Sequence, residues 1–147
     1  MVRPRSTGAC VLVGATTHQG VAGSDPLSWP RPPWDAIGEL TARYLGPVRR
    51  AGRGFLPGGT GPGEDEVMRV AGFQPPDRFE VGGGDVVERS ADQIVEAVFS
   101  LSSAAPHLFG ERFSAFESEL RELLRQESPD GRFTERTVPV ELRIWRR

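Results

Sequence analysis

The sequence predicts an α/β fold, and three patterns in its 147 residues carry this prediction. A short apolar run over 9–15 has the length and composition of a parallel strand buried on both faces. The segment 138–147 alternates apolar and charged residues, which is typical of a half-buried antiparallel strand at a sheet edge. Between these segments, apolar residues recur at helical spacing.

Composition excludes several classes of function. The net charge of −2 gives no global attraction to nucleic acid or to an anionic membrane, and no apolar run approaches the roughly 20 residues of a membrane span. All 18 basic residues are arginine, which rules out lysine Schiff-base chemistry and a phosphate-loop lysine. The single cysteine, Cys10, cannot form an intramolecular disulfide, and we expect it to be packed within its strand. We therefore expect a cytoplasmic protein.

The first half of the chain alternates between loops and short helices. A Pro-rich loop over 21–33 leads into a predicted helix from Trp34 to Leu45, and Gly46 ends that helix. A Gly/Pro-rich loop follows over 46–63. Three acidic residues then open a short predicted helix over 64–71, where their charge favours the positive end of the helix dipole.

The second half predicts a hairpin and a helical insert. A strand over 79–81, three glycines and a returning strand over 85–89 read as a hairpin. Ser90 and Gln93 have the spacing of a capping box, which opens a helical insert over 90–127. We expect one partial domain over 1–147, closed by the strand 138–147.

The polar residues after the first strand are the first place to look for a site. Ligands of open α/β sheets bind beyond the carboxyl ends of the strands, where Thr16, Thr17 and His18 follow. His18 is the candidate catalytic group, a substrate-side polar group or base, and the alternative is an ordinary loop histidine. Trp29 and Trp34 are candidate walls of the substrate pocket, or they clamp the loop to the core. No spacing of histidines or cysteines suggests a metal site.

Several segments, in order, resemble one enzyme family. Residues 8–13, 15–18 and 30–34 resemble the fifth strand and following loop of class I S-adenosylmethionine-dependent methyltransferases that act on small molecules. The segments 71–73 with 79–81, then 92–106, then 129–146 are similar to later parts of that family. The resemblance implies the C-terminal part of a doubly wound (Rossmann-like) sheet, S-adenosylmethionine as the cofactor of the parent enzyme, and a small-molecule substrate.

The family's cofactor-binding strands precede its fifth strand, and no residue of this sequence matches them. The resemblance therefore implies a substrate-side half without cofactor-binding residues, inactive alone and truncated relative to the family. Its open sheet edge would be covered by the missing N-terminal half or by a second copy in a homodimer. The alternative is a non-catalytic binding or assembly module derived from the same fold.

Overall fold

The computed structural model describes residues 8–15, 19–48, 50–51, 54–55 and 63–147. It is a mixed α/β structure, as predicted, with small antiparallel sheets. The described residues fall into two compact units. The sheet unit comprises those within 1–20, 60–85 and 137–147, and the helical unit comprises those within 21–59 and 86–136. The expectation of one partial domain over 1–147 stays a prediction.

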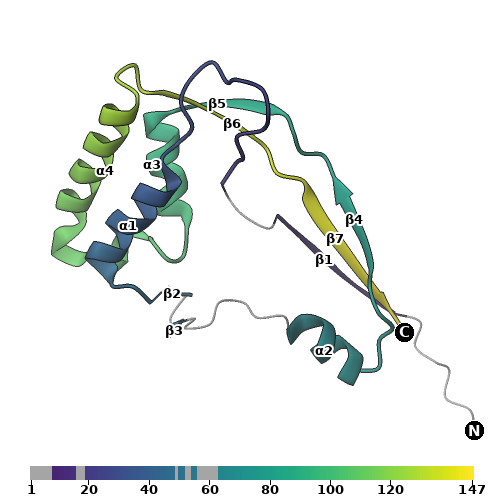
Figure 1. The fold of residues 1–147 in the computed structure, drawn as a ribbon. Helices are drawn as coiled ribbons and strands as arrows, with labels where there is room; N and C mark the ends of the chain where they lie inside the picture. Colours follow the sequence, from purple (N-terminus) through teal and green to yellow (C-terminus); the bar gives the residue numbers. More distant parts are fainter. Residues whose placement is uncertain (1–7, 16–18, 49, 52–53, 56–62) are drawn as a thin grey trace, which may run out of the picture. The chain divides into compact units, whose positions relative to one another are not determined.

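The sheet unit contains three strands in the order β1–β7–β4 (Figure 1). They are β1 (Ala9–Ala15), β7 (Val140–Arg146) and β4 (Asp77–Val81), and β7 is antiparallel to both neighbours. The strand predicted over 9–15 therefore exists, but it is antiparallel to its partner. The closing strand is antiparallel, as predicted, yet it lies in the middle of this sheet instead of at its edge.

One face of this sheet is apolar and open to solvent. Residues directly opposite each other on paired strands share a face, so the register of Val11 with Ile144 and of Val13 with Leu142 defines it. This apolar sheet face consists of Val11, Val13, Phe79, Val81, Val140, Leu142 and Ile144. The side chain of Val13 is 65% exposed and that of Phe79 is 51% exposed. The prediction that the first strand is buried on both faces is wrong, because no described element of the sheet unit covers this face.

The opposite face carries helix α2 (Gly63–Val70). Glu64 pairs with Arg143 of β7 at 2.8 Å, and Asp65 pairs with Arg78 of β4 at 2.5 Å. After the helix, the backbone N–H of Gln74 donates to the carbonyl oxygen of Arg146 at 2.8 Å. Helix α2, predicted over 64–71, is thus held to β7 at its N-terminal end, and the segment that follows the helix is held to β7 at Gln74.

The glycine turn does not form the predicted hairpin. Strand β4 pairs with β7, whereas β5 (Val86–Ser90) pairs with β6 (Arg132–Arg136) in a separate sheet. Gly82, Gly83 and Gly84 all have positive φ and connect the two strands. Both β4 and β5 pair with strands from the C-terminal part of the chain, so the glycine turn between them does not determine their pairing.

The helical unit holds α1 (Trp34–Leu45), α3 (Ala91–Ser100) and α4 (Phe113–Glu127) beside the β5–β6 pair (Figure 1). It also has the short strands β2 (Arg50–Ala51) and β3 (Gly54–Phe55) and two 3-10 turns, η1 (Pro106–Leu108) and η2 (Gly110–Arg112). The predicted helix over 34–45 and the helical insert are confirmed. So is the capping box, with both the Ser90 and Gln93 hydrogen bonds present.

The core of the helical unit is built from the apolar faces of α1, α3 and α4, together with Ala104, Phe109 and Phe133. Phe109 and Phe116 stack with their ring centroids 4.1 Å apart, and Tyr44 packs edge-on to Phe116 at 5.3 Å. The buried apolar residues are Trp34, Ile37, Leu40, Ile94, Val95, Val98, Ala104, Phe109, Phe116, Leu120, Leu124 and Phe133. This is a complete small core. Among the described residues, no helix is long and apolar enough to cross a membrane.

Candidate functional site

The structure does not describe the residues predicted to form a site after the carboxyl end of the first strand. Thr16, Thr17 and His18 lie outside the described residues, so their roles stay predictions. Cys10, in the strand itself, is exposed instead of packed. Its side chain points to the face of the sheet that carries α2, because it lies opposite Trp145.

The two predicted pocket tryptophans occupy different environments in the helical unit. Trp34 is 5% exposed, and its indole Nε1 donates to Glu135 Oε2 at 2.9 Å. Trp29 is half-buried, and the Arg132 guanidinium lies 4.6 Å from its ring centroid. Burial of Trp34 in the core is what the clamp interpretation expects. A role for either residue as a substrate wall stays a prediction.

Sequence reasoning missed the partner of Trp34. Glu135 of β6 is 2% exposed, and Arg89 Nε of β5 lies 2.7 Å from its second carboxylate oxygen. A buried carboxylate is tolerated only when it is paired and hydrogen-bonded in this way. A sequence signal for this strand does exist, because the residues 132–136 directly follow the Pro-Asp-Gly turn. Sequence reasoning assigned a strand only to the more regular alternation over 138–147.

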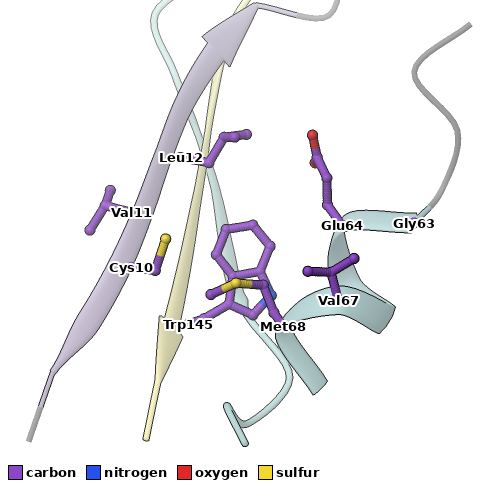
Figure 2. A pocket seen from close by; sticks show the side chains of 8 residues that line it. All are labelled: Cys10, Val11, Leu12, Gly63, Glu64, Val67, Met68 and Trp145. Carbon is purple, nitrogen blue, oxygen red and sulfur yellow. The ribbon is translucent and has the colours of Figure 1, made fainter. Parts of the chain in front are cut away.

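A pocket of about 430 Å³ lies between β1, β7 and α2, within the sheet unit (Figure 2). Cys10 and Leu12 of β1 line one side, and Val67 and Met68 of α2 line the other. The indole of Trp145 stands between them. This size and this largely apolar lining are those of a small-molecule pocket.

The pocket stays open because of where α2 is attached. The helix is held by ion pairs to β7 and β4, which draw it to that side of the face. Over β1, by contrast, the same face carries the small residues Cys10 and Gly14, and a Cβ built on Gly14 would meet no atom within 4 Å. Leu12 is the large side chain that β1 carries on this face, and it lines the pocket between these two small residues.

Trp145 contributes the one unusual polar group of this pocket. The residue is 2% exposed, and its Nε1 has no hydrogen-bond partner among the described residues. The guanidinium carbon of Arg143 lies 5.6 Å from the ring centroid. A buried donor without a partner costs about 1–3 kcal/mol, so such a group in a folded protein calls for an explanation.

In the described part of the chain, no group of three or more histidine, cysteine, aspartate or glutamate side chains could hold a metal ion. Comparisons with protein-family models, with curated proteins and with solved structures each give no match.

Proposed function

We propose that this chain forms the substrate-side end of a doubly wound, S-adenosylmethionine-dependent methyltransferase sheet. The topology of the sheet unit carries the proposal. Strands β1 and β4 are both antiparallel to β7 and therefore parallel to each other. The chain between them contains α2, which is paired to this sheet, as expected for a crossover connection between parallel strands. Many doubly wound folds carry an antiparallel strand at the edge of an otherwise parallel sheet, and here β7 lies next to the outermost strand, β4.

The outer edge of β1 supports this reading. Its seven residues, Ala9–Ala15, contain no charged side chain, and its described partner is β7 alone. Proteins protect such uncharged edges, because unpaired backbone groups invite another strand. Further parallel strands beyond β1 would pair this edge, and their flanking helices would cover the apolar sheet face.

The residues that the structure describes do not fit the cofactor. Dinucleotide and related sites use a glycine-rich turn between a strand and a helix, where backbone N–H groups are accessible. Within the described ranges, β5 is the strand that runs directly into a helix, and Ser90 stands at that junction. The proposal therefore places cofactor binding on a further segment of the protein or on a partner chain.

On the substrate side, the carboxyl end of β1 leads directly into Thr16, Thr17 and His18. Methyl transfer depends strongly on holding the acceptor atom in line with the methyl group, and polar side chains at this position would orient it. His18 would accept a proton when the acceptor atom carries one.

Variants of the two histidines test this assignment in the complete enzyme, in which the cofactor-binding strands are present. His18→Gln is expected to lower kcat by about 100-fold if it acts as a base. His107→Gln is the matched control, since His107 is exposed on η1 in the helical unit, and should leave kcat unchanged. Equal activity of both variants and the unmodified enzyme would remove His18 from the proposal.

A second candidate function is a non-catalytic assembly module. The exposed apolar sheet face favours it, because patches of this kind commonly mark protein interaction sites. Cofactor binding distinguishes the two functions. The native assembly of a methyltransferase should bind S-adenosylmethionine, whereas a non-catalytic assembly module should not.

A further inference from the structure

The pocket beneath α2 is separate from the residues proposed for methyl transfer, and its lining limits what it can bind. Glu64 is the charged residue in the lining, and it is paired with Arg143. Arg143 also approaches Glu141 at 3.4 Å. The described lining therefore offers a ligand no unpaired charge, and an ionic ligand would lose its hydration there without compensation.

The aromatic side chain in the lining favours a flat ligand. Trp145 presents an indole between β7 and α2 (Figure 2). Aromatic groups stack or meet edge-to-face with such a ring, beyond the gain from burial alone. Met68 borders the same space, and its flexible thioether adapts to ring edges.

The unpartnered N–H of Trp145 adds a polar requirement. Its Nε1 is buried at the pocket and lacks an acceptor within the described structure. Figure 2 shows the Met68 side chain beside the indole, and both residues line the pocket. A carbonyl or ether oxygen on the ligand would then satisfy a donor that otherwise remains unpaired at a cost.

We propose that this pocket is a binding site for an uncharged, flat, largely apolar molecule that carries one hydrogen-bond acceptor. Trp145 supplies the donor and one wall, and Val67 and Met68 supply the opposite wall. Cys10 lies at the rim with an exposed thiol. The proposal does not depend on methyltransferase activity, because no residue in it belongs to the loop after β1.

The probe is 6-propionyl-2-dimethylaminonaphthalene, a flat, uncharged ketone whose emission shifts to shorter wavelength in apolar surroundings. We expect saturable binding by the full chain with a blue shift. Trp145→Phe keeps an aromatic wall but removes the donor, so the affinity should fall about three- to tenfold. An unchanged affinity in a folded Trp145→Phe variant would overturn the hydrogen-bond assignment.

Two valines on α2 give a matched pair that does not disturb the core. Val67 lines the pocket and is 66% exposed, whereas Val70 is outside the lining and is 73% exposed. Val67→Glu places a carboxylate beside the probe and should weaken binding at least tenfold, and Val70→Glu should not. Equal loss in both variants, or in neither, would contradict the site.

The thiol gives an independent readout, because Cys10 is the chain's single cysteine. Saturating probe should slow the reaction of Cys10 with 5,5′-dithiobis(2-nitrobenzoate) several-fold, since an occupied pocket restricts access to the rim. An unchanged rate would place the probe elsewhere. The main alternative binding site for the probe is the apolar sheet face. Val81→Glu alters that face but not the pocket, so a loss of probe binding by this variant would overturn the proposal.

Discussion

The indole N–H of Trp34 donates to the carboxylate of Glu135 at 2.9 Å across 101 residues of sequence. This contact joins α1 to β6, and Arg89 holds the other carboxylate oxygen at 2.7 Å. The carboxylate is buried, so the loss of either partner should lower the free energy of unfolding.

Replacement of Trp34 by phenylalanine removes the donor and keeps an aromatic side chain. We expect the free energy of unfolding to fall by about 1–3 kcal/mol, because a buried carboxylate loses one of its hydrogen bonds. Urea unfolding followed by circular dichroism measures the change. Trp29→Phe, at a half-buried position, is the control and should cost less than about 1 kcal/mol. Equal costs would show that the Glu135 contact contributes nothing specific.

Two adjacent glycines separate backbone strain from steric clash. Gly83 and Gly84 have φ values of +89° and +85°. A Cβ on Gly83 would lie 2.7 Å from the backbone nitrogen of Pro139, whereas Gly84 faces open space. Gly84→Ala should therefore cost only the left-handed backbone penalty of about 1–2 kcal/mol. Gly83→Ala should cost clearly more in the same thermal unfolding assay, and the reverse order would contradict this geometry.

The single tyrosine of the chain reports on its contact with Glu119. Tyr44 donates its hydroxyl to Glu119 Oε1 at 2.6 Å, and this hydrogen bond raises the pKa of Tyr44 above its ordinary value of 10.0. The contact stabilises the folded state fully below pH 10 and loses this effect as pH rises through the raised pKa. Absorbance at about 295 nm should follow this titration.

Glu119→Ala should return the pKa of Tyr44 toward its ordinary value, because the acceptor and its charge are both removed. Glu117→Ala is the control, since Glu117 pairs with Arg121 instead. A Tyr44 titration that is the same in all three proteins would contradict the role of Glu119.

The apolar sheet face predicts concentration-dependent self-association of the 147-residue chain. Val13→Lys places a charge on that face at a position that is 65% exposed, and should shift the chain toward monomer in light scattering. Val70→Lys on α2, which is 73% exposed but outside the face, should leave association unchanged. A monomer at all concentrations before any substitution would count against this face as an interaction surface.

Sequence patterns predicted elements where the signal is local. The helix from Trp34 to Leu45 and the capping box at Ser90 follow from residues within a few positions of each other. Strand pairing was predicted less well, because it depends on distant segments. Strand β4 pairs with β7, and Arg78 of β4 bonds to Glu141 of β7 across 63 residues of sequence. The glycine turn had instead suggested that β4 pairs with the next strand in sequence.

The site followed the same division. The exposed face of β1 could not be read from an apolar run, since its burial depends on what packs against it. The pocket beneath α2 depends on the pairing of β1 with β7 and on the ion pair between Glu64 and Arg143, which join segments far apart in sequence. The buried pair of Trp34 and Glu135 likewise joins segments that no local pattern connects.

The central claim is that this chain completes a methyltransferase whose cofactor-binding strands lie beyond β1. Its most direct test is equilibrium binding of radiolabelled S-adenosylmethionine, measured on the native protein purified from its source cells and on the 147-residue chain alone. The account predicts stoichiometric binding by the native protein and none by the isolated chain. Absence of binding by the native protein, or equal affinity in the two samples, would contradict it.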